Sequence, residues 1–349
     1  MSSVLVAMSG GVDSSVAAAL MVARGHDVIG VTLKLWEGPD GRAPTAGCCT
    51  VADAEDARRA AATLDIPYYV LDATGPFRTG VVDPFVGAYL RGRTPNPCVE
   101  CNRTLKFSHL LAQADEFGCE LLVTGHHARV GFDGGRWRLL RGVDRAKDQS
   151  YVLSMLGQAE LERVRLPVGD FDKPRIRRIA TDLDLRTAAK PDSQDICFVG
   201  DGDYREFVRR VAAGAEHPGP IVDRSGRVLG AHRGVVDVTV GQRRGLGLAD
   251  GHRRYVVEVR PETATVVVGD LEDLAVSSLE LEGVSWVHDP PSGPVEVQYR
   301  AHGAPVAAVL EAGEVLHLGE PQYGVAPGQT ATVYRGDEVL GGGVIARTG

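Results

Sequence analysis

Residues 4–15 read VLVAMSGGVDSS, a short apolar run followed by two glycines, an aspartate and three serines. The run VLVAM predicts a buried strand, and the alanine-rich stretch from Asp13 to Arg24 predicts a helix directly after it. In an open parallel sheet, ligands bind at the carboxyl ends of the strands. Unpaired backbone N–H groups at a helix N-terminus favour phosphate in the same place. The stretch therefore predicts an α/β fold with an anion site at residues 9–15.

The alternation of strand and helix continues through the first half of the chain. Strand-like runs at 27–36, 68–73 and 119–127 are interleaved with helical stretches at 51–64, 77–92 and 105–118. Repeated β-α-β units imply a parallel sheet covered by helices on both faces. Residues 128–142 alternate around a Gly-Gly turn and predict a hairpin.

The pattern changes near residue 200. One more helix is expected at 202–214, and short alternating strands with Gly, Pro and Asp turns follow it. Beyond residue 275 the pattern is all-β, which is typical of a small barrel or sandwich. We therefore expect three domains: 1–200 with a parallel sheet, 201–275 as a small β-rich domain, and 276–349 as a β-barrel.

Composition limits the class of protein. Of the 349 residues, 44% are hydrophobic and 24% are charged, as in an ordinary globular protein. Apolar runs are too short to span a membrane and no signal peptide is evident, so we expect a cytoplasmic protein with mostly reduced cysteines. The net charge of −8 argues against a nucleic-acid partner, but residues 136–178 hold eleven basic and six acidic side chains. That stretch is either a solvated face or a patch that meets phosphates.

The loop at residues 9–15 differs from a Walker loop, because it is shorter and has no lysine. Gly10 and Gly11 would let the backbone approach a phosphate closely, and Ser9, Ser14 and Ser15 offer hydroxyl donors. Asp13 suits an anion site only if it caps the helix or acts through Mg²⁺. The loop resembles the pyrophosphate-binding loop of the ATP pyrophosphatases, and the alternative is a plain strand-to-helix turn.

Two segments carry further candidate residues. TPNPCVECNRTLKF at 94–107 is expected to form a stiff loop that ends at Cys101 and Asn102, because prolines disfavour a helix there. KPDSQDICFVG at 190–200 places Cys197 in a strand-like piece. A neighbouring Lys106 or Lys190 would favour the reactive thiolate. Cys98 and Cys101 form a CxxC, but no second half of a zinc site follows at the usual spacing.

The motifs SGGVDSS, TPNPCVECN, LVTGHHAR, DQSYVL and DSQDICFVG occur in the order and approximate spacing of the tRNA-specific 2-thiouridylases, which the chain resembles along nearly its whole length. The resemblance implies ATP-dependent replacement of the C2 oxygen of the wobble uridine in tRNA by sulfur. It implies an ATP-pyrophosphatase domain, a small central domain and a C-terminal β-barrel. It also implies that Cys197 carries a persulfide, supplied by a sulfur-donor protein, and that Cys101 is the nucleophile.

The same resemblance implies further binding residues. Those for ATP are Ala7, Met8, Ser9, Gly10, Gly11, Val12, Asp13, Ser14, Leu33 and Gly125. Those for tRNA are Asn96, Pro97, Cys98, His126, Lys147, Asp148, Gln149, Gln298, Tyr299 and Gln329, the first three at the target base. The chain departs from the family pattern at two positions, with Cys98 where some members have aspartate and Gln298 where arginine is usual.

Alternatives remain open at this point. A ligase that makes an amide or thioamide on a small molecule would share the loop but would need neither paired thiols nor RNA. A tRNA-binding protein with metal-binding cysteines would not need the loop. Cys98 is either a bystander near the base or, with Cys101 and Cys197, a third ligand of an iron–sulfur cluster. We favour the bystander and expect no resident metal, because a persulfide route needs only two cysteines.

Overall fold

The structure is a computed structural model, and it describes residues 1–37, 50–192, 196–199, 203–214, 217–248 and 251–349. Its first part is a five-stranded parallel sheet in the order β3-β2-β1-β4-β7. The strands are β1 (Ser3–Ala7), β2 (Asp27–Lys34), β3 (Tyr68–Asp72), β4 (Leu121–Val123) and β7 (Val164–Arg165). The order places β1 in the middle of the sheet, so the loop that follows β1 opens at the centre of the carboxyl edge.

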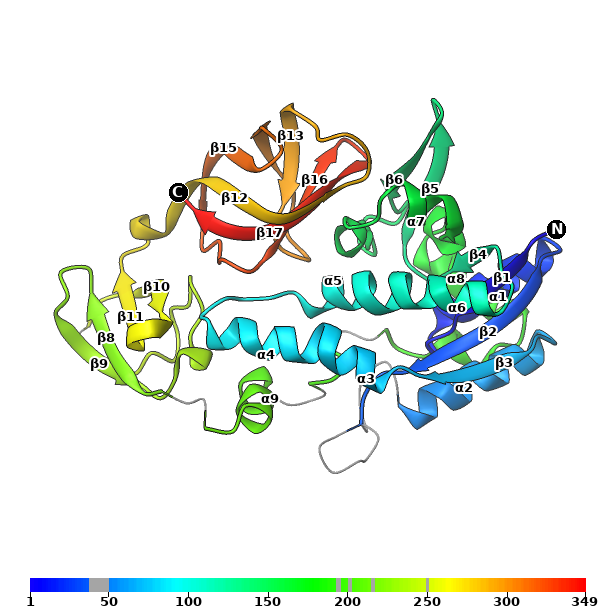
Figure 1. The fold of residues 1–349 in the computed structure, drawn as a ribbon, viewed down its shortest axis with the longest axis horizontal. Helices are drawn as coiled ribbons and strands as arrows, with labels where there is room; N and C mark the ends of the chain where they lie inside the picture. Colours follow the sequence, from blue (N-terminus) through cyan, green and yellow to red (C-terminus); the bar gives the residue numbers. More distant parts are fainter. Residues whose placement is uncertain (38–49, 193–195, 200–202, 215–216, 249–250) are drawn as a thin grey trace.

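Helices cover both faces of this sheet (Figure 1). They are α1 (Val12–Ala23), α2 (Val51–Thr63), α3 (Thr74–Phe77), α4 (Asp83–Leu90), α5 (Pro97–Cys101), α6 (Leu110–Glu116), α7 (Gln158–Arg163) and α8 (Lys173–Asp182). Val4 and Val6 of β1 belong to one apolar core with α1, α2 and α8, and Leu5 belongs to the other with α4 to α6. Successive strand residues point to opposite faces, which is why a continuous apolar run serves a sheet covered on both sides.

The middle of the chain forms a separate four-stranded sheet in the order β10-β11-β8-β9. Its strands are β8 (Gly219–Asp223), β9 (Val228–His232), β10 (Tyr255–Arg260) and β11 (Thr265–Gly269). Helix α9 (Tyr204–Val211) precedes them and packs on the N-terminal part, where the ring of Phe207 lies 5.8 Å from that of Trp36. The expected boundaries near residues 200 and 275 stay predictions.

The C-terminal part is a closed antiparallel barrel, because β12 pairs with both β15 and β17. Its strands are β12 (Ala275–Trp286), β13 (Gly293–Gln298), β14 (Val306–Glu311), β15 (Val315–Tyr323), β16 (Thr330–Arg335) and β17 (Glu338–Thr348). The predicted hairpin is present as β5 (Ala128–Asp133) and β6 (Arg136–Arg141). Strand β6 pairs with β17, so the hairpin extends the barrel sheet and links it to the first part of the chain.

The parallel sheet, the small central β sheet and the barrel confirm the fold expected from the sequence. Two local expectations were wrong. The stiff loop ends at Asn96 rather than at Cys101, because Pro97 occupies the first turn of α5 and Asn96 caps that helix through its side chain. Proline is tolerated there, since the first-turn N–H groups have no helical partner. Cys197 lies in a turn and not in a strand.

Candidate active site

The loop after β1 is closed by its own serines. The Ser14 hydroxyl accepts from the backbone N–H of Ser9 at 3.1 Å and donates to the carbonyl of Gly11, to which Ser15 Oγ also donates, at 2.9 Å. Gly11 stands at the N-cap of α1 and has no side chain with which to cap the first turn. The first N–H groups of a twelve-residue helix are thus left for an anion.

Two glycines make the loop possible. Gly10 has φ +71°, and a Cβ there would lie 2.2 Å from the carbonyl oxygen of Asp53. Gly125 follows β4, and a Cβ there would lie 2.6 Å from the backbone nitrogen of Ser14. Any larger residue at Gly125 would push the loop out of place. At both positions only glycine allows the neighbouring backbone to pack this closely around the loop.

A cavity of about 600 Å³ opens beside this loop, a size that suits a nucleotide. Nine of the ten predicted ATP residues line it: Ala7, Met8, Ser9, Gly11, Val12, Asp13, Ser14, Leu33 and Gly125. Gly10 is outside the lining and lies against Asp53. The cavity also takes in side chains that the sequence did not single out for this site, namely Thr32, Asp53, His127, Lys173, Lys190, Asp192 and His302.

The Asp13 carboxylate has two side-chain partners, Lys173 and His127. The Lys173 ammonium lies 2.8 and 2.7 Å from the two Asp13 oxygens, and His127 Nε2 lies 3.0 Å from Oδ1. Burial acts to raise the pKa of Asp13, but His127 and Lys173 outweigh it and leave the pKa below its ordinary value. Asp13 is therefore ionised and paired, and it does not cap α1 as one expectation had it.

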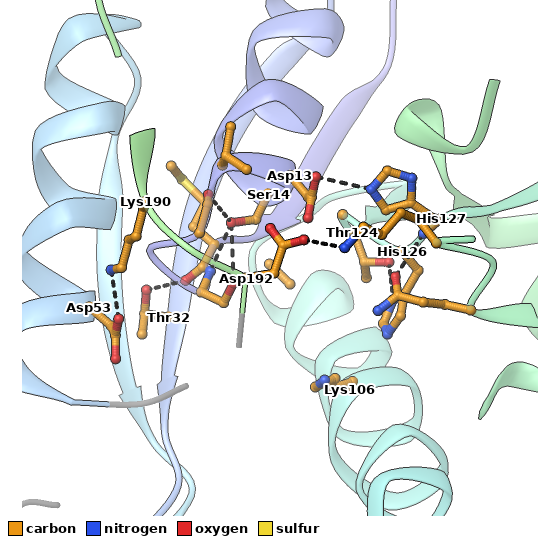
Figure 2. A pocket seen from close by; sticks show the side chains of 18 of the residues that line it. Asp13, Ser14, Thr32, Asp53, Lys106, Thr124, His126, His127, Lys190 and Asp192 are labelled. Atoms are coloured by element: carbon orange, nitrogen blue, oxygen red, sulfur yellow. Dashed lines mark hydrogen bonds and ion pairs between the residues drawn. The ribbon is translucent and has the colours of Figure 1, made fainter. Parts of the chain in front are cut away.

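Lys190 reaches the opposite side of the loop. Its ammonium donates to the carbonyl of Gly10 at 3.0 Å and to the carboxylates of Asp53 and Asp56 at 2.7 Å each. Figure 2 shows Lys190 and Asp53 on one side of the cavity and His126 and His127 on the other. These contacts support the loop, and the suggested role of Lys190 beside a thiolate stays a prediction.

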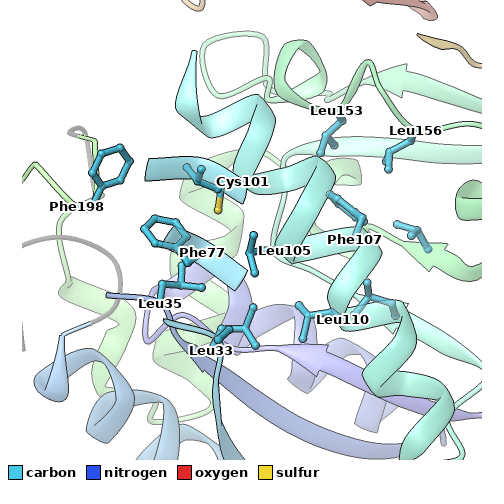
Figure 3. Packing of buried hydrophobic residues seen from close by; sticks show 14 of the residues in the cluster. Leu33, Leu35, Phe77, Cys101, Leu105, Phe107, Leu110, Leu153, Leu156 and Phe198 are labelled. Atoms are coloured by element: carbon cyan, nitrogen blue, oxygen red, sulfur yellow. The ribbon is translucent and has the colours of Figure 1, made fainter. Parts of the chain in front are cut away.

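Cys101 is the last residue of α5, and a π-helical stretch (Asn102–His109) continues the helix. It is 6% exposed and belongs to the apolar cluster on one face of the sheet. Figure 3 shows Cys101 among Phe77, Leu105 and Phe198. The Asn102 side chain donates to the carbonyl of Val152 at 2.9 Å, which fixes the helix beside the thiol.

Cys197 packs against that same cluster although it is 96 residues away in sequence. The adjacent Phe198 is buried, and its ring lies 5.6 Å from that of Phe77. Leu33, Leu35 and Leu110 belong to the cluster and also line the cavity beside the phosphate loop. Both cysteine segments therefore pack on one apolar cluster, and part of that cluster lines the cavity.

Three family models match consecutive parts of the chain: a tRNA methyl transferase HUP domain at 2–201, a tRNA methyl transferase PRC-barrel domain at 205–270 and an aminomethyltransferase β-barrel domain at 276–345. A tRNA-specific 2-thiouridylase MnmA from Chloroflexus aggregans is 47% identical, with 99% of each chain covered. Another from Acidothermus cellulolyticus is 50% identical, with 99% of this chain and 98% of that one covered. This chain belongs to the tRNA-specific 2-thiouridylase family.

The residues that the 2-thiouridylase resemblance assigned to tRNA fall into separate places. His126, Lys147, Asp148 and Gln149 line the cavity beside residues 9–15. Asp148 accepts from the backbone N–H groups of Gly142 and Ser150, and Gln149 Oε1 accepts from that of His127, so both side chains also order this loop. Burial lowers the pKa of His126 to about 3, so its contacts at neutral pH are those of an uncharged imidazole.

The loop before α5 meets the barrel. The backbone N–H of Thr94 donates to the carbonyl of Pro327, and a Cβ at Gly328 would lie 2.8 Å from Thr94 N. Gln329 lies in the same barrel turn, next to the loop that carries Asn96. Asn96, Pro97 and the exposed Cys98 are thus grouped with Gln329, which is consistent with their common assignment to tRNA.

Gln298 and Tyr299 are buried in the barrel, at 6% and 8% exposure. The Gln298 amide donates to the carbonyls of Arg300 and Ala301 at 3.0 and 3.1 Å, so it holds the turn that leads to His302. His302, which belongs to the barrel part of the chain, lines the same cavity. The glutamine that departs from the family pattern therefore has a local structural partner, while its role toward tRNA stays a prediction.

Among the described residues, no group of three or more His, Cys, Asp or Glu side chains is placed to hold a metal ion. Over the same residues, no helix is long and apolar enough to cross a membrane. Of the basic side chains on α8, Lys173 and Arg177 turn toward carboxylates, whereas Arg175 and Arg178 are exposed. The basic stretch is therefore partly an internal network and partly a surface.

Proposed function

We propose that this chain catalyses ATP-dependent 2-thiolation of the wobble uridine of tRNA. The observation that carries the proposal is the continuity of the phosphate-loop cavity with the apolar cluster that holds Cys101 and Cys197. Membership of the 2-thiouridylase family supports it. A ligase for a small molecule would use the cavity, but it would have no use for two thiols on the apolar cluster that adjoins it.

The uracil C2 oxygen is a poor leaving group, and transfer of AMP from ATP to that oxygen makes it a good one. The N-terminus of α1 receives the pyrophosphate that leaves, because its N–H groups and the adjacent lysines match the departing charge. Gly10 and Gly125 allow the backbone to approach the phosphates. Leu33 and Leu35, which line the apolar part of the cavity, exclude water from the activated carbon.

Sulfur then arrives through the two cysteines. A donor protein loads Cys197 as a persulfide, and the Cys101 thiolate attacks the sulfur that is bonded to the Cys197 Cβ. A Cys101–Cys197 disulfide forms, and hydrosulfide leaves to attack C2 and expel AMP. An external two-electron dithiol reductant restores both thiols. The position of the two segments on one cluster supports this assignment.

The finer assignments complete the proposal. Mg²⁺ accompanies the ATP phosphates in the cavity. Asn96, Pro97 and Cys98 contact the target base, which must leave the anticodon stack to reach the cavity. Cys98 is a bystander at this base and no iron–sulfur cluster is required. The reduced thiols that the mechanism needs agree with a cytoplasmic location.

The test is to incubate the protein with unmodified tRNA, ATP and a persulfide donor, and to digest the tRNA for nucleoside analysis. The proposal expects 2-thiouridine at the wobble position, with AMP and pyrophosphate formed in equal amounts. Thiolation without ATP, or ATP cleavage with bulk tRNA and no thiolated nucleoside, would contradict it. Iron and sulfide analysis of anaerobically purified protein, with the activity of Cys98→Ala, tests the role of Cys98.

A further inference from the structure

The carboxylate of Asp148 is occupied by donors from its own part of the chain. Its Oδ1 accepts from the backbone N–H groups of Gly142 and Ser150, at 3.0 and 3.1 Å. Its Oδ2 accepts from the Arg141 guanidinium at 3.2 Å and from the Ser150 hydroxyl at 3.0 Å. An ionised carboxylate has about four acceptor positions, and the Asp148 side chain is only 7% exposed. It therefore has little left to offer to a ligand such as tRNA.

The contacts of Asp148 fix the backbone on both sides of His127. Gln149, next to Asp148, makes two hydrogen bonds to His127: its Oε1 accepts from the backbone N–H and its own N–H donates to the carbonyl, at 2.9 Å each. A Cβ at Gly142 would lie 2.6 Å from that same carbonyl oxygen, so Gly142 packs directly on it. Asp148 thus joins the two segments that enclose the backbone of His127.

The imidazole of His127 connects this enclosure to the phosphate loop. The ring is 3% exposed, and its Nε2 lies 3.0 Å from Oδ1 of Asp13 (Figure 2). Its Nδ1 is buried and has no hydrogen-bond partner within the described ranges of the chain, so the contact with Asp13 fixes the direction of the ring. Lys173 also contacts both Asp13 oxygens, at 2.8 and 2.7 Å. His127 is therefore one of two supports of this carboxylate.

We propose that Asp148 is a positioning residue of the nucleotide site, which acts through His127 on Asp13 of the phosphate loop. The inference rests on the proposed function, because it requires ATP to bind beside that loop. It assigns Asp148 to the support of ATP binding, whereas the family resemblance assigned it to tRNA. A buried and fully paired carboxylate suits a supporting role, and an anion at a contact surface would repel the phosphates of tRNA.

Substitutions at position 148 loosen this arrangement in steps. The single oxygen of asparagine can keep the two backbone N–H groups, but its NH₂ group presents donors to Arg141, which is itself a donor. Alanine removes all four contacts and leaves the N–H groups of Gly142 and Ser150 without their partner. Asp148→Asn is therefore the mild variant and Asp148→Ala the severe one.

The first test is the affinity for a non-hydrolysable ATP analogue, measured by titration calorimetry with Mg²⁺ and without tRNA. We expect binding to weaken by about threefold in Asp148→Asn and about tenfold in Asp148→Ala, since Lys173 still holds Asp13 in both. Asp182→Asn makes the same charge change at an exposed position of α8 and should leave the affinity unchanged. Thermal melting confirms that each variant is folded. Wild-type affinity in a folded Asp148→Asn protein would overturn the inference.

The affinity for unmodified tRNA, measured by filter binding without ATP, separates the two assignments of Asp148. It should stay within about twofold of the wild type in Asp148→Asn, because the carboxylate has no free acceptor for tRNA. A loss of tRNA affinity with ATP affinity retained would assign Asp148 to tRNA and contradict the inference.

A double-mutant cycle tests the path through His127. Asp148→Asn should weaken binding of the ATP analogue in the wild-type background but not in the His127→Ala background, where the support of Asp13 from this side is already lost. Equal losses in the two backgrounds would rule out this path, since a general loosening of the structure gives that result. If the wild-type protein does not bind the analogue at all, the proposed function fails, and the inference fails with it.

Discussion

Hydrogen bonds between residues no more than five apart close the turn at residues 9–15, whereas Cys101 and Cys197 are brought to one apolar cluster by packing of segments almost a hundred residues apart. The first region is polar and is nearly complete within one stretch of sequence. The second is apolar and exists only when the fold is complete. Phosphate chemistry in this protein thus depends on local backbone geometry, and sulfur chemistry depends on tertiary packing.

Replacement of Cys197 separates the two regions most sharply. Cys197→Ser should reduce tRNA thiolation by about a thousandfold or more, because it removes the sulfur carrier. Pyrophosphate release should survive, since the phosphate loop is untouched. The matched control is Cys119→Ser, because Cys119 is a buried cysteine of the same cluster to which the mechanism gives no role. If Cys197→Ser still forms thiouridine, the persulfide belongs elsewhere, and Cys98 becomes the candidate.

Asp13→Ala addresses the other region. It leaves the ammonium of Lys173 and the imidazole of His127 without their shared partner beside the loop. We expect tRNA-dependent pyrophosphate release to fall by about a hundredfold. Asp182→Ala provides the control for loss of an exposed aspartate. Rates of pyrophosphate release near those of the wild type would show that Asp13 is dispensable for activation.

Gly125→Ala tests how closely the loop is fitted. The added Cβ would lie 2.6 Å from Ser14 N and 2.8 Å from the carbonyl carbon of Asp13, which forces the loop to shift. We expect ATP binding to weaken by about tenfold and unfolding to become easier by about 1–3 kcal/mol. Gly75→Ala, where a Cβ meets nothing within 4 Å, is the control. Equal ATP affinity and stability in the two variants would contradict a tightly fitted cradle.

The smallest effect concerns the surface of α8. Arg175→Gln with Arg178→Gln should weaken tRNA binding and lower the slope of log affinity against log salt by about two, if each arginine meets a phosphate. The double variant Arg58→Gln with Arg59→Gln on α2 carries the same charge change as a control. If the salt dependence of tRNA binding is unchanged in the α8 variant, these arginines face solvent and do not contact tRNA phosphates.

The strands and helices of the first part could be predicted because their periodicity is local. The β1 strand and the start of α1 after residues 9–11 were predicted for the same reason. The prediction of a loop up to Cys101 was wrong, because proline disfavours the interior of a helix but not its first turn, where Pro97 lies. Asn96 before Pro97, with Glu100 in the first turn, is a helix-start signal that was available in the sequence.

Lys173 and Asp192 could not be assigned to the cavity from the sequence. The partner of Lys173 at Asp13 is 160 residues away, and both lysine and aspartate are ordinary residues in the surroundings of α8. Their place is set by how α8 packs against α1, through Ile176 and Ala180. Periodicity shows that such a helix has an apolar face, but it does not show which charged neighbours will be turned inward.

The pairing of β6 with β17 bears on folding during synthesis of the chain. Strand β6 ends at Arg141 and β17 begins at Glu338, so about 200 residues are synthesised before the partner strand exists. At about 5–20 residues per second this leaves the edge of β6 open for roughly 10–40 s. Arg136, Arg138 and Arg141 line that strand, and charge on an open edge discourages pairing with other chains. Once the barrel forms, Glu338 of β17 makes ion pairs with Arg136 and Arg138. The charges that protect β6 during synthesis therefore later stabilise its pairing with β17.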